Sequence, residues 1–404
     1  MTGPDLTPLD RHPGARAALE RIWTVLPQAR LVGGVVRDLM IRQDVADIDL
    51  ATPEPPETVI ERLGAAGIRT IATGLTHGTV TALVGGHPVE ITTLRRDQET
   101  DGRHAVVAWT EDWREDAQRR DFTINAMSLA RDGTLYDYFG GAADLDAGRV
   151  RFVGEAATRI AEDALRILRF FRFEARYGRG IPDEAAVGAI ALSLPALDGL
   201  SAERIWSELR RILVGPDTAR IIALMHGLGV LDRLLPGGAT PARLSDLLAL
   251  GLPPEPILRL AALLRGAPAP VAQALRLSNT EAAALEALAR LPAPEPHMDD
   301  AALRRLLAEA PADLLGGRSW LAQADQPAGD PEAWTMLRQR LAAMQRPVFP
   351  LAGRDVLELG RAPGPEIGRL LAQIRDWWIA GGCAADRAAC LDHLRVLSSD
   401  SRAC

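Results

Sequence analysis

The stretch ADIDLAT, residues 46–52, sets two aspartates, Asp47 and Asp49, on either side of one isoleucine and continues into apolar residues. Side chains two residues apart on a β-strand leave the same face, so this spacing predicts two neighbouring carboxylates. Two like charges at that distance repel each other, and a divalent cation between them would remove the repulsion. The alternative is a strand end with two solvated aspartates, and the pair alone does not decide between the two.

The composition indicates a globular chain of more than one domain. The 404 residues exceed what one core usually supports, and the apolar (47%) and charged (25%) fractions are ordinary. No run approaches the roughly 18 apolar residues of a transmembrane helix, and the first residues lack the apolar segment of a signal peptide. The three cysteines are Cys383, Cys390 and Cys404, which predicts neither a disulfide framework nor a zinc cluster. We therefore expect a cytoplasmic protein without a membrane anchor.

The charge pattern restricts how this chain can bind nucleic acid. A net charge of −7 argues against a uniformly basic binder, but a local basic groove remains compatible with it. All 46 basic residues are arginine, since the sequence contains no lysine. Every cationic contact to a phosphate or a base must therefore come from a guanidinium group.

The character of the chain changes near residue 150. Before it, short β-branched runs alternate with turns that contain glycine and proline, which predicts an α/β domain. After it, leucine, alanine and arginine recur with helical periodicity, and proline-rich breaks separate the segments. The sequence therefore predicts an α/β N-terminal domain followed by a long, mostly helical arm.

A glycine pair lies upstream of the aspartates in LVGGVVRDLM, residues 31–40. Gly33 and Gly34 follow an apolar run and precede a predicted helix, where backbone N–H groups can approach a phosphate. Arg37 on the first helical turn would add a cation, and we expect Asp38 to orient or cap the helix. The alternative for the glycine pair is an ordinary tight turn.

A third carboxylate, Glu90, lies on an apolar strand in HPVEITTLR, residues 87–95. A glutamate in such a strand usually faces solvent at an edge. If it faces Asp47 and Asp49 instead, the three carboxylates complete a two-metal site for phosphoryl or nucleotidyl transfer.

The segment EDALRILRFFRF, residues 162–173, predicts a base-recognition helix. Asp163 and Arg166 are i and i+3, which places an acceptor and a donor on one face. Cytosine and adenine offer an amino donor beside a ring acceptor, so the pair matches both and leaves polar groups unpaired against guanine and uracil. The alternative is a salt bridge on a solvated helix. Arg169 and Arg172 continue at spacing three and could orient the pair or reach the triphosphate.

The segment RRDFTINAM, residues 119–127, places two arginines ahead of a predicted apolar strand. Arg120 is the expected triphosphate contact, with Arg119 as a second candidate. Asp121 and Asn125 are expected to brace the strand and loop. A basic turn that merely enters a strand is the alternative.

Together, GG-x-VRD and D-x-D resemble the DNA polymerase β-type nucleotidyltransferase superfamily, and more narrowly the class II, bacterial-type tRNA nucleotidyltransferase/poly(A) polymerase family. Further stretches that resemble this family are TGLTHGTVT (73–81), TDGRH (100–104), RRDFTINAM (119–127), DYFGGAADLDAGRVRFVG (137–154), EDALRILRFFRF (162–173) and LAGRDVLELGRAPGPEIGRLL (351–371). The match is dense over residues 31–178, thins through the helical middle and returns at 351–371.

The resemblance implies a DNA polymerase β-type head followed by helical neck, body and tail. The implied domains are a catalytic head (1–148), a neck that recognises the nucleotide (149–215), an RNA-binding body (216–345) and a tRNA-binding tail (346–404). It also implies two Mg²⁺ ions on Asp47 and Asp49, with Glu90 as the third catalytic carboxylate. Arg169 and Arg172 both belong to the implied nucleotide site.

The implied activity is addition or repair of the 3′-terminal CCA of tRNA from CTP and ATP, without a template. The implied partner is the acceptor stem and T-arm of tRNA, with no membrane and no obligate protein partner. TDGRH favours CCA addition, because it resembles the loop associated with switching from C to A. A poly(A) polymerase, an enzyme that adds only A or only C, and a non-catalytic RNA-binding protein on the same head remain alternatives. A fused HD-type phosphohydrolase module is not expected, since no such His-Asp doublet occurs.

Overall fold

The computed structural model describes residues 5–45, 47–100, 105–326, 329–360 and 362–400. Contacts between residues divide the chain into two compact units, residues 1–233 and 234–404. None of the described helices is long and apolar enough to cross a membrane.

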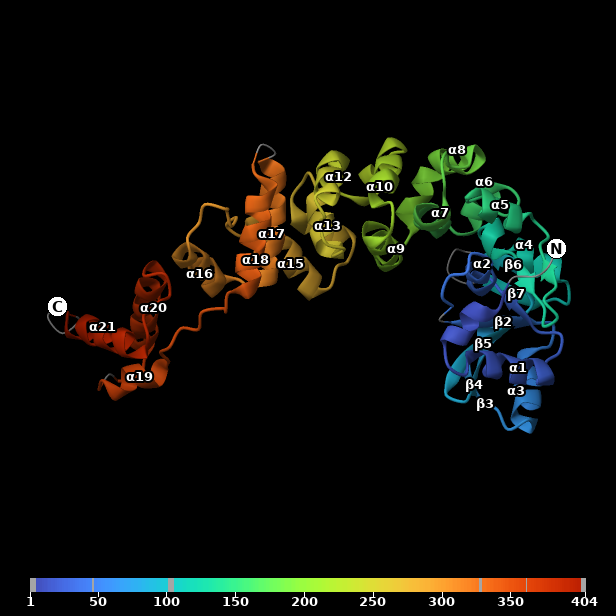
Figure 1. Ribbon diagram of the computed structural model, residues 1–404, viewed down its shortest axis with the longest axis horizontal. Coiled ribbons are helices and arrows are strands. Elements are labelled where there is room, and N and C mark those ends of the chain that lie inside the picture. The colour runs from blue at the N-terminus through green and yellow to red at the C-terminus, as the bar shows by residue number, and fades with distance from the viewer. Residues whose placement is uncertain (1–4, 46, 101–104, 327–328, 361, 401–404) are drawn as a thin grey trace. The chain divides into compact units, whose positions relative to one another are not determined.

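The N-terminal unit contains a seven-stranded mixed sheet in the order β3-β4-β5-β2-β1-β8-β9 (Figure 1). The β2–β5 pair is parallel and all its other pairs are antiparallel. A separate hairpin joins β6 to β7. The strands are β1 (Arg30–Val32), β2 (Ile48–Thr52), β3 (Arg69–Gly74), β4 (Thr79–Val84), β5 (His87–Thr93), β6 (Arg95–Thr100), β7 (Ala105–Trp109), β8 (Ser128–Leu129) and β9 (Leu135–Tyr136).

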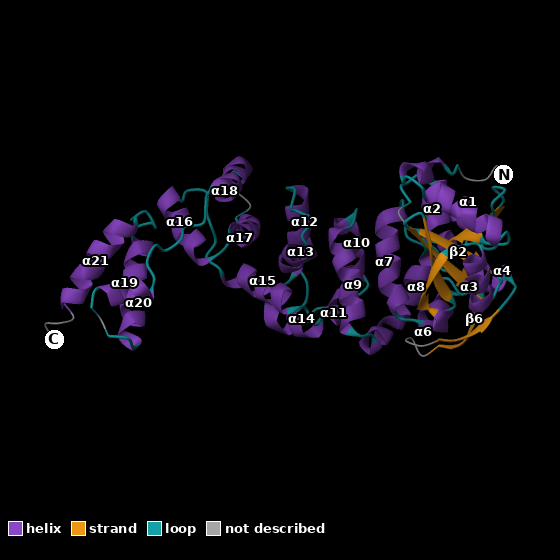
Figure 2. Cartoon of the chain, turned by 90° about the horizontal axis from the view of Figure 1, so that it is seen from below, coloured by secondary structure: helices purple, strands orange, loops and turns teal. Residues whose placement is uncertain are grey.

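Short helices accompany the sheet (Figure 2). They are α1 (Ala15–Val25), α2 (Gly34–Met40), α3 (Pro56–Ala65), α4 (Trp113–Gln118) and α5 (Gly141–Ala147), with 3₁₀ turns η1 (Thr7–Arg11), η2 (Leu75–His77) and η3 (Thr123–Asn125). Helix α1 packs on β5 and α3, and α3 packs on β3 and β4. The amphipathic face of α1 buries Leu19, Ile22 and Trp23 completely, which fixes the sheet against it.

The rest of the N-terminal unit is helical. It contains α6 (Ala156–Glu162), α7 (Leu165–Tyr177), α8 (Glu184–Ser193), η4 (Leu194–Gly199), α9 (Ala202–Val214), α10 (Thr218–Gly227) and α11 (Val230–Leu234). Phe122, just before η3, packs its ring centroid 5.0 Å from those of Phe152 and of Phe173 on α7. This buried aromatic cluster holds α7 against the sheet domain, and so places the arginine-bearing face of α7 beside β1 and α2.

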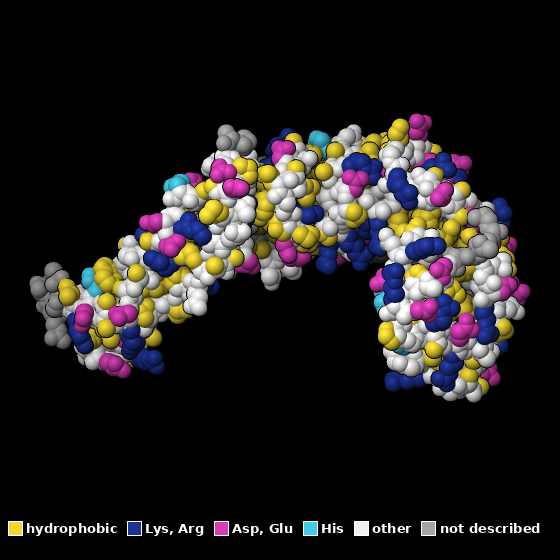
Figure 3. Space-filling model, viewed as in Figure 1, with side chains coloured by type: hydrophobic (Ala, Val, Ile, Leu, Met, Phe, Trp, Pro, Cys, Tyr) yellow, Lys and Arg dark blue, Asp and Glu magenta, His cyan; other side chains and the backbone are white. Residues whose placement is uncertain are grey.

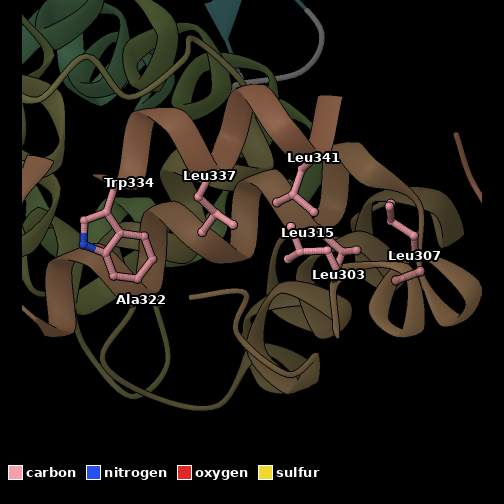
Figure 4. Close-up of a cluster of buried hydrophobic side chains, with 8 residues drawn as sticks. Leu303, Leu307, Leu315, Ala322, Trp334, Leu337 and Leu341 are labelled. Carbon is pink, nitrogen blue, oxygen red and sulfur yellow. The ribbon is translucent and has the colours of Figure 1, made fainter. Parts of the chain in front are cut away.

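Among the described residues of the C-terminal unit, the secondary-structure elements are all helices, apart from an isolated bridge between Ala239 and Leu264. Its helices are α12 (Pro241–Ala249), α13 (Pro256–Leu263), α14 (Pro268–Ala274), α15 (Asn279–Arg290), α16 (Asp300–Glu309), α17 (Ala312–Asp325), α18 (Pro331–Ala343), α19 (Gly353–Glu358), α20 (Pro365–Ala380) and α21 (Arg387–Asp400). Leu337 and Leu341 of α18 pack with Leu315 of α17 and Leu303 of α16 in one core (Figure 4). A second core joins α19, α20 and α21 around Ile374.

The predicted change from α/β to helical structure is confirmed, because the last strand, β9, ends at Tyr136 and helices follow. Two local predictions are wrong. The arginines of RRDFTINAM do not enter an apolar strand directly: the 3₁₀ turn η3 intervenes, and β8 is only two residues long. The segment 162–173 is not one helix, because α6 ends at Glu162 and α7 begins at Leu165. The four-part domain division stays a prediction, and residues 101–104 of TDGRH lie outside the described residues.

Candidate active site

The parallel pairing of β2 with β5 brings the predicted carboxylates together. Asp49 lies directly opposite Glu90 in the register of the two strands, and Asp47 immediately precedes β2. Asp47 and Glu90 are exposed and Asp49 is partly buried. Burial, reinforced by the charges of Glu90 and Asp47, raises the pKa of Asp49 to about 6, although Arg120 opposes the shift. The negative charge at this strand end is therefore in excess.

The donor set suits a hard divalent cation. Within the described residues, no three Asp, Glu, His or Cys side chains gather closely enough to hold a metal ion between them. Mg²⁺, however, is commonly held by one or two carboxylates together with phosphate oxygens of a substrate. Asp47 and Asp49 fit that mode, since they offer oxygen ligands whose mutual repulsion a cation would relieve. The assignment of Glu90 as a third carboxylate stays a prediction.

The glycine pair forms the connection from β1 to α2. Gly33 has φ 67° and ψ −130°, a conformation open to glycine and costly for other residues. A Cβ atom at Gly33 would lie 3.1 Å from Nη1 of Arg120. The missing side chain thus leaves room for the arginine beside the backbone, at the edge of the carboxylate site.

Arg37 is held more firmly than the sequence suggested. Its guanidinium is almost fully buried, and its Nε and Nη2 donate to Asp38 at 3.0 and 3.1 Å. Its Nη1 donates to the side-chain oxygen of Asn125 at 2.5 Å. Asp38 therefore pairs with Arg37, and the positive charge of Arg37 is partly neutralised.

Arg119 and Arg120 share one buried carboxylate, that of Asp116 on α4. Nη2 of Arg119 lies 2.7 Å and Nη2 of Arg120 lies 3.0 Å from its two oxygens. Burial alone would raise the pKa of Asp116, but the charges of Arg120 and Arg119 outweigh it and hold the pKa below the usual value. Asp116 was not among the predicted residues, although its spacing of three and four from the two arginines was visible in the sequence.

The predicted pairing of Asp163 with Arg166 along one helix is wrong. Asp163 has extended backbone (φ −154°, ψ 105°) at the break between α6 and α7. Its Oδ1 accepts the Leu165 N–H at 3.1 Å, and its Oδ2 accepts from Arg204 of α9 at 2.7 Å. No ion pair joins Asp163 to Arg166 among the described contacts, so the alternative of a simple surface salt bridge is wrong as well.

Arg166 has its own set of partners. Nη1 donates to Glu162 at 2.5 Å and to the Arg159 carbonyl at 2.9 Å, and Nη2 donates to the Arg119 carbonyl at 3.0 Å. Glu162, at the end of α6 and four residues before Arg166, is the carboxylate that pairs with this arginine across the break between the two helices. Asp163 and Arg166 still face a common cavity, as described below.

The two remaining arginines of α7 differ in their surroundings. Arg169 donates through Nε to buried Asp121 at 2.7 Å, which confirms Asp121 as a bracing residue. Arg172 donates to Glu208 of α9 at 2.6 Å and lines a neighbouring pocket instead of the cavity that contains Arg169. Its role at the nucleotide site stays a prediction.

One cavity of about 500 Å³ gathers most of the predicted site. Its walls are Gly33, Gly34, Arg37, Asp49, Arg119, Arg120, Asp121, Asn125, Asp163, Arg166, Arg169 and Phe173. Asp47, Glu90 and Arg172 are not on its walls. On the face drawn in Figure 3 basic and acidic side chains are interspersed, in keeping with the net charge of −7. The cavity itself is lined by five arginines and three aspartates, so its walls carry a local excess of positive charge.

The chain is similar to known proteins in both sequence and structure. Residues 29–151 match the model of the poly A polymerase head domain. The mitochondrial CCA tRNA nucleotidyltransferase 1 of Mus musculus is 36% identical over 395 residues, with 91% of this chain and 86% of that protein covered. The chain belongs to the class II tRNA nucleotidyltransferase family. The family prediction is thereby confirmed, as is the fold class.

Other members of the tRNA nucleotidyltransferase family extend the comparison. Residues 182–240 match a model described as the probable RNA and SrmB-binding site of polymerase A. The CCA-adding enzyme of Geobacillus thermodenitrificans is 37% identical over 212 residues, which is 52% of this chain and 51% of that enzyme. The solved Bacillus stearothermophilus CCA-adding enzyme in complex with CTP has a TM-score of 0.75 at 29% identity, covering 97% of this chain and all of that one.

Proposed function

We propose that this tRNA nucleotidyltransferase adds or repairs the 3′-terminal CCA of tRNA from CTP and ATP. The observation that carries the proposal is one cavity that contains Asp49, the Asp163/Arg166 pair and four further arginines, Arg37, Arg119, Arg120 and Arg169. Nucleotidyl transfer without a template requires three parts: carboxylates at one edge of the site, a wall that binds the phosphates and a wall that recognises the base.

The proposed cofactor is Mg²⁺, two ions held by Asp47 and Asp49. When bound, divalent cations in such sites activate the attacking hydroxyl and stabilise charge on the leaving pyrophosphate. Asp49 contributes a partly buried oxygen ligand, and in this proposal Glu90, opposite it across the β2–β5 pair, activates the 3′-hydroxyl of the RNA by accepting its proton. Asp47 and Glu90 lie outside the cavity walls, and their charges beside Asp49 favour a cation at this strand end.

The triphosphate is held by the arginine wall. Arg119 and Arg120 are fixed by Asp116, and Arg169 is fixed by Asp121, so their forks have few alternative orientations. A planar guanidinium donates two parallel hydrogen bonds to phosphate oxygens, which positions as well as attracts the substrate. The backbone of Gly33 and Gly34 adds a surface free of side chains where the phosphates can approach.

Base selection falls to Asp163 and Arg166. Their contacts leave lone pairs on both Asp163 oxygens, and the five N–H donors of a guanidinium exceed the number that Arg166 uses. Asp163 accepts from the amino group of cytosine or adenine, and Arg166 donates to the ring nitrogen beside it. Guanine and uracil reverse this order and would leave the pair unsatisfied.

The helical segments that follow the sheet domain are proposed to hold the acceptor stem and T-arm of tRNA through shape and backbone contacts, since duplex RNA exposes little readable sequence in its deep groove. The cytoplasmic location remains a proposal, since the relative from Mus musculus is named as mitochondrial.

The deciding experiment supplies purified protein with a tRNA transcript that lacks its 3′ end, together with CTP, ATP and Mg²⁺. The expected product is longer by C, C and A, and Asp47→Ala should give none. Long A tails on an unstructured RNA would instead assign the protein as a poly(A) polymerase. Binding of tRNA without any extension would assign it as a non-catalytic RNA-binding protein.

A further inference from the structure

A second pocket, of about 410 Å³, lies beside the nucleotide cavity in the N-terminal unit. It is bounded by the C-terminal half of α7 and by the end of α9 with the turn that follows. Its walls are Arg37, Arg172, Phe173, Ala175, Arg176, Tyr177, Arg211, Val214, Gly215 and Pro216. Four of these residues are arginines and none is acidic, so positive side chains dominate the charged part of its walls.

The charges of these arginines are only partly compensated. Asp38 pairs with Arg37, and Glu208 pairs with Arg172 at 2.6 Å. Exposed Arg176 donates to the neutral side chain of Gln43 at 2.9 Å. Exposed Arg211 has no hydrogen-bond or ion-pair partner among the described residues.

Two positive charges, those of Arg176 and Arg211, are thus left for an anion. Burial lowers the pKa of Arg172, and the positive charges of Arg169 and Arg211 lower it further. The negative charge of Glu208 offsets part of this shift. The same crowding of cations that disfavours a further positive charge favours a bound negative one.

The pocket adjoins the nucleotide cavity through shared walls. Arg37 and Phe173 line both. The guanidinium carbon of Arg37 lies 4.3 Å from the ring centroid of Tyr177, and that of Arg172 lies 4.7 Å from that of Phe173. These stacked rings keep the guanidinium planes fixed between the two spaces. The two spaces are therefore immediate neighbours.

We propose that this pocket binds a backbone phosphate of the RNA primer, close to its 3′ end. The proposal rests on the proposed function, because the primer hydroxyl must then lie near Asp49 and the phosphates behind it must lie against the protein. Arginine forks bind phosphodiesters by paired hydrogen bonds without regard to the base, as a primer whose end changes with each addition requires. The triphosphate of a nucleotide offers the same phosphate chemistry, so it is the competing ligand for this pocket.

The test compares two neighbouring arginines of α9. Arg211 lines the pocket, whereas Arg210 is equally exposed, is not on its walls and serves as the matched control. The dissociation constant of a tRNA that lacks its terminal A is measured at several salt concentrations for wild type, Arg211→Ala and Arg210→Ala. The KM for ATP and the melting temperature are measured on the same proteins.

Arg211→Ala should weaken tRNA binding about five- to tenfold, the loss of one charge-assisted phosphate contact. It should also flatten the slope of log K against log salt by about 0.7–0.9. Arg210→Ala should change both much less, and the KM for ATP should stay within about twofold in every variant. Arg211→Glu should exaggerate the tRNA effect at an unchanged melting temperature.

Equal tRNA affinities for Arg211→Ala and Arg210→Ala would overturn the proposal. A rise in the KM for ATP with unchanged tRNA affinity would also overturn it and assign the pocket to the triphosphate. Both outcomes require a wild-type protein that extends tRNA, so they are distinct from a failure of the proposed function, in which wild type adds nothing.

Discussion

Asp49→Asn should abolish nucleotide addition and yet stabilise the metal-free protein. The fold holds Asp49 against the charges of Glu90 and Asp47, and its pKa is raised from 3.8 to about 6. Among the described contacts its carboxylate accepts no hydrogen bond, so an amide loses none. The folded state therefore disfavours the carboxylate form. This penalty is absent below pH 3.8, grows as the pH rises towards 6 and is constant above it.

The size of the effect follows from the same values. The difference between 3.8 and about 6 corresponds to about 3 kcal/mol, and solvent at this partly buried site reduces it to about 1–2 kcal/mol. In EDTA at pH 8 the melting temperature of the N-terminal unit should rise by about 2–8 °C. At pH 5 the gain should shrink to about half, because wild-type Asp49 is then largely protonated.

The assay is thermal unfolding of wild type, Asp49→Asn and Asp44→Asn. Asp44 is the matched control, because its exposed carboxylate lies 3.4 Å from Arg11 and its removal should bring no gain. Added Mg²⁺ should raise the melting temperature of wild type and Asp44→Asn, and should affect Asp49→Asn least. An Asp49→Asn protein that melts at or below the wild-type temperature at pH 8 would refute the account of charge repulsion, and near-normal activity would refute the role as a ligand.

Three further variants test the other walls of the cavity. Asp163→Ala should weaken CTP and ATP use together by about ten- to a hundredfold, and should reduce discrimination against UTP and GTP, in steady-state kinetics with each nucleotide; full discrimination in this variant would move base recognition elsewhere. Arg120→Ala should raise the KM of all four nucleotides alike, since a phosphate contact carries no base information, and a selective effect on one nucleotide would contradict this. Gly33→Ala should cost about 1–3 kcal/mol in stability, measured by denaturation, because φ is 67° and the new Cβ would meet Arg120; a neutral result would show that the turn relaxes freely.

The sequence was sufficient for strand β2 because strand geometry is local and periodic. Asp49 lies on β2 with Asp47 immediately before it, and Glu90 is opposite Asp49 because β2 and β5 pair in parallel. The sequence could not show that pairing, which is a contact between separate segments. It was supplied by the resemblance of the motifs to a family.

The pair that we propose to read the base shows where local spacing fails. Helical periodicity gives Asp163 and Arg166 a common face, but it assumes that the helix is continuous. The extended backbone of Asp163 breaks the helix, and Arg204 of α9 takes its free oxygen. Glu162 then binds Arg166. A partner from another helix cannot be derived from spacing within one segment, so the two side chains converge through the cavity and not along a helix.

The common feature of the arginines that we propose to bind phosphate is that each is paired with a carboxylate before any substrate arrives. Asp116 holds Arg119 and Arg120, and Asp121 holds Arg169. Each carboxylate removes one positive charge, which lowers the long-range attraction for a nucleotide. In return the guanidinium planes are fixed, so less side-chain entropy is lost when phosphate binds. A chain whose basic residues are all arginine can use this arrangement throughout, because a fork that donates to a carboxylate along one edge still presents its other donors to the substrate.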